Sequence, residues 1–146
     1  MSMKRAAQLY ELAAAQGHAG AQYYLGACID NGRGGVKLDK KKAQKYYTLS
    51  ADQGYTDAQF KCATAFYFGQ EGNEMDRKKA GHYFALAAEQ GHADAQYASG
   101  RMHLGGDGVE FDPKEAQRLW ELAAAQGHEE AQRDLQMLTE CNLEHR

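Results

Sequence analysis

Histidine has the widest chemical repertoire of the residues in this chain, since it can ligate metals or transfer protons near neutral pH. Three of the six histidines, His18, His92 and His128, each follow a Gln-Gly pair. Zinc ligands must all lie about 2 Å from one ion, and the chain has no Cys-x-x-Cys or His-Glu-x-x-His spacing that would bring them together. We therefore expect no metal site, and we expect a structural role for these histidines.

The three cysteines, Cys28, Cys62 and Cys141, lie at irregular positions. An odd number without regular spacing argues against a secreted disulfide scaffold, and free, buried thiols are the default expectation for Cys28 and Cys62. A disulfide between these two remains the alternative. Titration of free thiols under denaturing conditions distinguishes the two.

A catalytic centre needs a nucleophile with a base in reach. His82 and Glu89 share one face of an expected helix, but seven residues correspond to about 10 Å of rise, which is too far for a dyad. The glycine clusters at 32–35 and 105–108 follow expected helices and lack the Gly-Lys-Ser/Thr ending of a phosphate-binding loop. We predict no catalytic residue and no cofactor.

The elements that position these residues are helices. The chain has 25 alanines but only two valines and one isoleucine, so it is rich in helix formers and poor in the residues that suit sheets. The net charge of −3 gives no reason to expect binding to nucleic acid or anionic membranes. The sequence shows no signal peptide and no apolar run that would insert into a membrane. Together with the irregular cysteines, this favours a cytoplasmic location.

A fixed repeat organises the whole chain. Gln-Gly recurs at Gln16, Gln53, Gln90 and Gln126, in steps of 37, 37 and 36 residues, and Ala-Gln follows each pair. Recurrence at such a period is typical of a solenoid. The same residue types also recur in columns upstream of each glycine: alanine (Ala6, Ala43, Ala80, Ala116), an aromatic residue (Tyr10, Tyr47, Phe84, Trp120), leucine (Leu12, Leu49, Leu86, Leu122) and a second alanine (Ala14, Ala51, Ala88, Ala124).

Each period predicts two helices. The first helix is expected to begin after an N-cap, because serine and aspartate accept hydrogen bonds from free amides of the first turn, and to end at Gln-Gly, where glycine permits a left-handed conformation. The second helix is expected from about Ala19 to Asn31 and at equivalent places, ending at Gly32, Gly69 or Gly106. Pro113 is expected at a first helical position. The predicted N-caps are Ser2, Asp39, Asp76 and Asp112.

These columns resemble the Sel-1-like repeat family, which is related to tetratricopeptide repeats. The resemblance rests on Gln16-Gly17, Ala21-Gln22, Leu25-Gly26 and Gly35-Val36 with Asp39. It implies an all-α fold, a right-handed α/α superhelical solenoid of four helix-turn-helix repeats. We expect a single domain, 1–146, with repeats at about 2–38, 39–75, 76–111 and 112–141 and a polar tail at 142–146.

The columns that vary between repeats indicate where a partner binds. On the first helix of each repeat they lie together, opposite an apolar arc of about 200° formed by the recurrent columns, and the resemblance implies that this helix lines a concave side. The varying columns also contain the small residues Ala7, Gly81, Ala15 and Ala125. The predicted partner-binding residues are Gln8, Glu11, Gln44, Lys45, Thr48, Asp52, His82, Ala85, Glu89, Gln117, Arg118 and Glu121.

Lys45, His82 and Arg118 occupy equivalent positions of successive repeats. Such a basic row can grip acidic side chains or a C-terminal carboxylate of an extended peptide. The alternative is a solvated helix face of mixed charge, because Asp52, Glu89 and Glu121 lie nearby in the sequence pattern.

The resemblance implies a protein-interaction scaffold or adaptor that binds a partner peptide or domain on its concave surface. A hydrolase or cell-wall-associated protein, as described for cysteine-rich relatives, is the alternative. The chain is also consistent with one segment of a longer repeat array. The first helix has a packing face with no preceding neighbour, so a weak homodimer through the N-terminal repeat is a further expectation.

Overall fold

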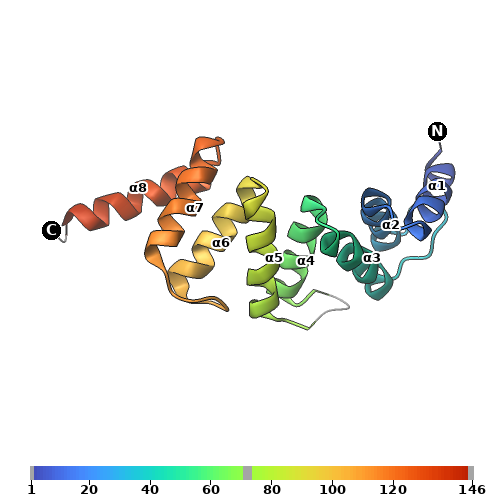
Figure 1. The fold of residues 1–146 in the computed structure, drawn as a ribbon, viewed down its shortest axis with the longest axis horizontal. Helices are drawn as coiled ribbons and strands as arrows, with labels where there is room; N and C mark the ends of the chain where they lie inside the picture. Colours follow the sequence, from blue (N-terminus) through green and yellow to red (C-terminus); the bar gives the residue numbers. More distant parts are fainter. Residues whose placement is uncertain (1, 71–73, 145–146) are drawn as a thin grey trace. The chain divides into compact units, whose positions relative to one another are not determined.

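The computed structural model describes residues 2–70 and 74–144, and the described residues form helices joined by turns and loops, without strands (Figure 1). The predicted all-α fold is confirmed. The loop expected after Gly69 and the expected polar tail lie partly outside the described residues, at 71–73 and 145–146. The helices are α1 (Met3–Ala15), α2 (Ala19–Asn31), α3 (Lys40–Asp52), α4 (Thr56–Phe68), α5 (Arg77–Glu89), α6 (Ala93–Gly105), α7 (Pro113–Ala125) and α8 (Glu129–Glu144).

The helices alternate as the repeat predicts. We call α1, α3, α5 and α7 the A helices and α2, α4, α6 and α8 the B helices. The chain divides into two compact units, Met1–Tyr83 and Phe84–Arg146, which we describe separately. In the first unit α2 packs on both α1 and α3, and in the second α7 packs on both α6 and α8. Each such helix is thus covered on two sides, as in a repeat solenoid.

The A helices begin at the predicted caps. The side chains of Ser2, Asp39, Asp76 and Asp112 each accept a hydrogen bond from the backbone amide three residues further on. Each bond satisfies one of the amides that the first turn of a helix leaves without an internal partner. Pro113 is the first residue of α7, where its missing amide costs nothing.

The turn from each A helix to its B helix has two fixed parts. The Gln-Gly glycine takes a positive φ, from +86° to +93°, which only glycine adopts without strain. Nδ1 of His18, His92 and His128 then accepts a hydrogen bond of 3.1 Å from the backbone amide three residues on. The expectation that these histidines have a structural role is confirmed: they are N-caps of B helices. Tyr55 holds the fourth such place without a side-chain cap, and its ring lies 5.3 Å from that of Tyr23.

Glycine in the B helices lets the aromatic column approach. A Cβ atom on Gly26 would lie 3.1 Å from the ring of Tyr47, and one on Gly100 would lie 2.5 Å from Nε1 of Trp120. The indole of Trp120 also donates a 3.1 Å hydrogen bond to the carbonyl of Tyr97, which fixes it against α6. Tyr47 and Trp120 are each only 4% exposed. The aromatic column therefore fills the space between a B helix and the next A helix.

The two glutamine columns are joined by hydrogen bonds. Nε2 of Gln96, on α6, donates to the carbonyl of Ala88 at the end of α5, and its Oε1 accepts from Nε2 of Gln126 after α7. In the first unit Gln22 donates in the same way to Ala14 and accepts from Gln53. Each of these buried amides therefore connects its own A helix to the turn of the next repeat.

Three sequence expectations need correction. Three of the four residues of the leucine column do not pack: Leu12, Leu49 and Leu122 are 65%, 52% and 43% exposed, because two positions along a helix turn the side chain about 200° from the aromatic column. Leu86 is half-buried. Ala7, expected on the free face, is 1% exposed, because the loop at Gly34 closes over it, and Gly81 is also buried. Finally, α8 continues to Glu144, so the helix includes residues 142–144 of the predicted tail.

Replacing Gly100 with alanine is expected to destabilise the chain by about 1–3 kcal/mol, because the new methyl group overlaps the Trp120 indole and the core must shift. Gly105→Ala is the matched control: it lies in the same helix, where a Cβ atom meets no neighbour within 4 Å, and helix propensity favours alanine by up to about 1 kcal/mol. Thermal unfolding followed by circular dichroism measures both. Equal melting temperatures for the two variants would contradict the close contact.

Gln96→Leu is expected to cost about 1–3 kcal/mol, because it removes two hydrogen bonds, one to the carbonyl of Ala88 and one from the side-chain amide of Gln126. The carbonyl of Ala88 then keeps only its bond from the backbone amide of Gly91. Gln132 makes the same bond, to Ala124, but is exposed and lies in the last repeat. Gln132→Leu should therefore change stability by less than about 0.5 kcal/mol. Urea unfolding of the two variants provides the comparison, and similar losses would show that the connection between repeats contributes nothing.

Candidate functional site

The predicted partner-binding residues lie on the four A helices. Ten of the twelve are exposed, whereas Gln44 and Thr48 are half-buried. These two form a small polar cluster with the buried Cys62 of α4: Nε2 of Gln44 lies 3.3 Å from the hydroxyl of Thr48 and 3.5 Å from Sγ of Cys62. Burial is the main reason that the pKa of the Cys62 thiol rises to about 11. Gln44 and Thr48 therefore take part in packing against α4, and they are only partly accessible to a partner.

Asp52 is held by a neighbouring helix. The hydroxyl of Tyr83 donates a 3.1 Å hydrogen bond to its carboxylate. Burial of the ring, followed by the charge of Asp52, raises the pKa of Tyr83 to about 12. The phenol therefore stays protonated at neutral pH and keeps donating, so that Asp52 is a positioned carboxylate on an otherwise exposed surface.

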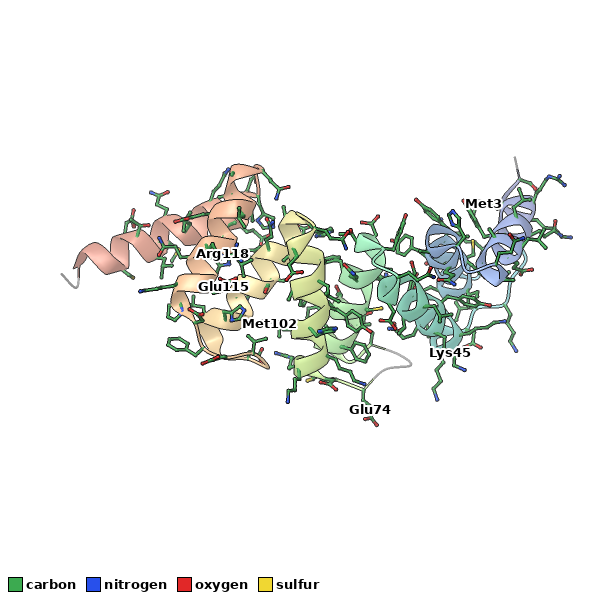
Figure 2. All side chains as sticks on the ribbon, in the orientation of Figure 1. Met3, Lys45, Glu74, Met102, Glu115 and Arg118 are labelled. Carbon is green, nitrogen blue, oxygen red and sulfur yellow. The ribbon has the colours of Figure 1, made fainter. Side chains whose placement is uncertain are left out.

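The three residues of the basic row are in different electrostatic states. The guanidinium of Arg118 donates two hydrogen bonds, of 2.9 and 2.5 Å, to the carboxylate of Glu115 (Figure 2). This pairing lowers the pKa of Glu115 and raises that of Arg118. The His82 ring lies edge-on to Tyr83, with centroids 5.3 Å apart, and Lys45 is exposed. The cationic charge of Arg118 is thus already balanced within the chain.

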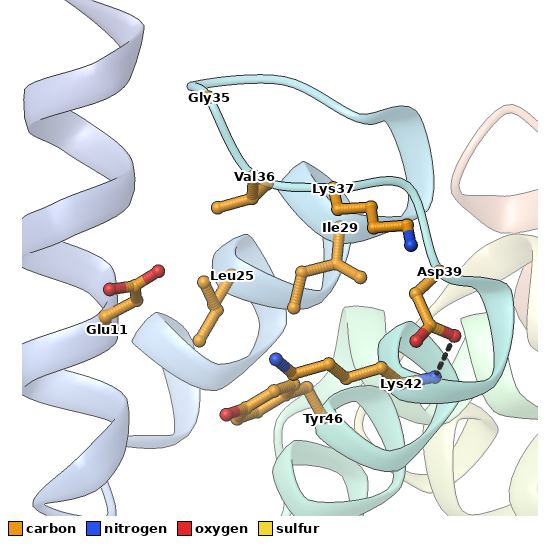
Figure 3. Close-up of a pocket in the computed structure, with 9 residues that line it drawn as sticks. All are labelled: Glu11, Leu25, Ile29, Gly35, Val36, Lys37, Asp39, Lys42 and Tyr46. Carbon is orange, nitrogen blue, oxygen red and sulfur yellow. Dashed lines mark hydrogen bonds between the residues drawn. The ribbon is translucent and has the colours of Figure 1, made fainter.

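A groove of about 600 Å³ opens between α1, α2 and α3 in the first unit (Figure 3). Leu25 and Ile29 of α2 form its floor, Glu11 of α1 lies on one side of them, Tyr46 of α3 lies below in this view, and the loop after α2 lies above. This first groove is lined by Glu11, Leu25, Ile29, Gly35, Val36, Lys37, Asp39, Lys42 and Tyr46.

The second unit has a groove of about 430 Å³ at the equivalent place, between α5, α6 and α7. Five positions of the repeat line both grooves: Glu11 corresponds to Ala85, Leu25 to Ser99, Ile29 to His103, Lys42 to Glu115 and Tyr46 to Leu119. The second groove is lined by Ala85, Ala88, Glu89, Gly91, Gln96, Ser99, His103, Glu115, Arg118, Leu119 and Leu122. The two grooves therefore occupy equivalent positions of the repeat but are lined by side chains of different chemical character.

Four of the predicted binding residues, Glu11, Ala85, Glu89 and Arg118, line these two grooves. A depression of about 470 Å³ along α3 adds Lys45, and it shares Asp39, Lys42 and Tyr46 with the first groove. The structure does not bring Gln8, Gln44, Thr48, Asp52, His82, Gln117 or Glu121 into these grooves.

Sequence reasoning missed the groove residues that recur or come from B helices. Leu49 lines the depression and Leu122 lines the second groove, although the recurrence of their column predicts a packing role. The signal lay in the helical wheel: a recurrent apolar column about 200° from the core side has no packing reason to recur. Lys42 and Tyr46 carry no such signal, because only their place beside Leu25 and Ile29 of the preceding B helix makes them groove residues.

Asp30 makes internal contacts in the first unit. Asp30 lies 2.8 Å from Nζ of Lys40 and 3.8 Å from Nζ of Lys61, and it accepts a hydrogen bond from Tyr47.

In the described part of the chain, no group of three or more histidine, cysteine, aspartate or glutamate side chains is placed to hold a metal ion. Over the same residues, no helix is both long and apolar enough to cross a membrane.

Comparison with known proteins identifies the repeat. The Sel1 repeat matches residues 2–18, 19–55, 56–92 and 93–128. The chain belongs to the Sel1 repeat family. The family divides the chain so that a repeat begins with a B helix, whereas the predicted repeats begin with an A helix; both divisions describe the same alternation. Sel1 repeat proteins are generally protein-interaction scaffolds that bind protein partners, and their repeats are typically non-catalytic.

Solved structures of Sel1-type proteins share the fold. A Sel1 repeat protein from Oxalobacter formigenes is 30% identical, with a TM-score of 0.82, over 88% of this chain and 96% of that one. The antigen c5321 of uropathogenic Escherichia coli is 26% identical, with a TM-score of 0.88, over 94% of this chain and 29% of that one. Cysteine-rich protein B of Helicobacter pylori is 22% identical, with a TM-score of 0.66, over 88% of this chain and 90% of that one. Among curated proteins, no sequence matches significantly.

All three cysteines of this Sel1 chain are free, with Cys28 and Cys62 buried and Cys141 exposed. We expect one thiol to react rapidly with a disulfide reagent at pH 8 in the native state and three to react in denaturant, because burial raises the pKa of Cys28 and Cys62 and lowers their thiolate fraction. Titration without reductant gives the two numbers. A single reactive thiol in denaturant would instead indicate a Cys28–Cys62 disulfide.

Proposed function

We propose that this Sel1 chain is a scaffold or adaptor that binds a peptide or domain of a partner protein on the helix-A surface, the side predicted to be concave. The observation that carries this proposal is the recurrence of a groove at the same repeat position in both units. In each, two A helices form the sides and a B helix forms the floor. Volumes of about 600 and 430 Å³ fall in the range of ligand pockets.

The exposed leucine column supports the same surface. An exposed leucine beside a groove offers apolar area that a partner can cover, and about 1.4 kcal/mol from such burial changes a dissociation constant tenfold. Leu122 lines the second groove, and Leu49 lines the depression that continues from the first. Because the grooves are held by packed helices, little ordering is needed when a segment binds.

The predicted residues outside the grooves fit the proposal as a polar rim. Gln8, Gln117 and Glu121 are exposed on the A helices, and rim residues of this kind contribute specificity more than affinity. We also propose that the basic row contacts the partner, but its three residues differ in how readily they can do so. Lys45 and His82 present cationic or polar groups, whereas Arg118 first has to exchange Glu115 for a ligand carboxylate.

Self-association through the N-terminal repeat is a second partner interaction that we propose. Met3, Leu9 and Leu12 are 51%, 42% and 65% exposed on α1, so this helix offers an apolar surface of its own. The interaction is expected to be weak, and light scattering over a concentration series accompanies each binding measurement below to separate it from peptide binding.

The test begins with a random peptide library displayed on phage and selected on the immobilised chain. Enriched peptides are labelled and titrated by fluorescence anisotropy. We expect a variant with Leu49→Ser and Leu122→Ser to bind them about tenfold more weakly, because each change removes exposed apolar area beside a groove.

The matched control changes Phe68→Ser and Met137→Ser, two exposed apolar residues of B helices (63% and 64% exposed). It should bind within about twofold of the parent. Equal affinity of the two double variants would contradict the helix-A surface as the binding site. A selection that enriches no peptide would contradict peptide binding itself.

A further inference from the structure

The two grooves share a geometry but differ in character. The first has Leu25, Ile29 and Tyr46 where the second has Ser99, His103 and Leu119. Val36 adds a further apolar wall to the first from the loop. The floor of the first groove is therefore apolar and that of the second is polar. An extended segment gains most from placing a bulky apolar side chain in the first groove.

Lysines surround the first groove. Lys37 and Lys42 line it, and Lys41, Lys42 and Lys45 line the depression that continues from it along α3. Lys40 is set apart from them, because its Nζ contacts Asp30 at 2.8 Å. The whole chain has a formal charge of −3, so four lysines in this short region reverse the local sign.

The acidic residues of the region do not neutralise these lysines fully. Asp39 caps α3, with its carboxylate accepting a hydrogen bond from the backbone amide of Lys42. Glu11 lies on the α1 side, and the side chain of Lys42 extends beside Tyr46 toward that side (Figure 3). With two carboxylates against four ammonium groups, the region keeps a net positive charge that attracts anions.

The equivalent cation of the second groove is neutralised. Glu115 stands where the first groove has Lys42, and it forms the bidentate pair with Arg118, which stands where α3 has Lys45. An acidic ligand at the second groove would have to break this pair. At the first groove it meets lysines that are open to solvent, so the two grooves differ in the charge that they present to a ligand.

We propose that the first groove binds an acidic segment of a partner protein, with one bulky apolar side chain seated on Leu25, Ile29 and Tyr46 and carboxylates beside Lys42 and Lys45. This inference rests on the proposed function and names the class of ligand. Apolar burial supplies affinity, while the lysines select charge and accelerate encounter at low salt.

Three synthetic fluorescent peptides of equal length test the proposal. One places phenylalanine among aspartates and glutamates, one places it among lysines, and one is acidic with alanine in place of phenylalanine. We expect the first to bind at least about tenfold more tightly than either other peptide, and its affinity to fall as salt is raised. If the lysine peptide binds equally well, the charge selection is wrong; if the alanine peptide does, the apolar seat is wrong.

Lysine variants locate the site. Lys42→Gln with Lys45→Gln should weaken the acidic phenylalanine peptide about tenfold and reduce its dependence on salt. The control with Lys78→Gln and Lys114→Gln changes the net charge equally at exposed lysines outside the first groove, and should stay within about twofold. Equal losses in both variants would show a general attraction to net charge and overturn the proposal.

Glu11→Lys provides a test that misfolding cannot imitate. Converting the carboxylate on the α1 side into an ammonium should tighten binding of the acidic phenylalanine peptide about threefold to fivefold. Unchanged or weaker binding, with circular dichroism like that of the parent, would place the ligand elsewhere. Peptides that bind the helix-A surface without acidic preference would overturn this inference alone, whereas the absence of any peptide binding would overturn the proposed function as well.

Discussion

The fold depends on the need of buried amides for hydrogen-bond partners. Burying a glutamine side chain without hydrogen-bond partners destabilises a fold by more than its packing stabilises it. Gln22 and Gln96 are nevertheless only 5% and 3% exposed. Each is satisfied from two sides, by a carbonyl at the end of its own A helix and by the glutamine that follows the next A helix. Within each unit, the recurrent Gln-Gly and Ala-Gln pairs are therefore two halves of one connection between neighbouring repeats.

Much of the fold could be predicted because its signals are local. An N-cap, a left-handed glycine and a proline at a first helical position act within one turn, so Asp39, Gly17 and Pro113 could be placed from sequence alone. The histidine caps belong to the same class. The grooves depend instead on contacts between successive repeats. The recurrence of a residue type does not show whether its side chain points toward a neighbouring helix or toward solvent. Leu12 recurs and is exposed, while Ala7 varies from repeat to repeat and is covered by a loop.

The grooves follow from the same packing. An A helix meets the B helix before it through a glycine and one aromatic ring, as Tyr47 does at Gly26 and Trp120 at Gly100. The space left between two A helices is found at equivalent positions in the two units. Part of its lining comes from buried core residues such as Leu25 and Ile29, and part from exposed positions of the A helices. The exposed positions are free to vary, which is why Lys42 in one unit can correspond to Glu115 in the other.

The loops that join successive repeats are fixed at both ends. A left-handed glycine ends α2, α4 and α6, and the amide of the following aspartate donates a hydrogen bond back to that helix, as Asp39 does to Ile29 and Asp112 to His103. Residues 106–112 connect α6 to α7 and number one fewer than residues 32–39 between α2 and α3, which accounts for the single step of 36 residues. A deletion there leaves every helical face in register, whereas one within a helix would turn the following face by about 100°. The loops are thus where the length of this repeat can drift during evolution without disturbing the stack.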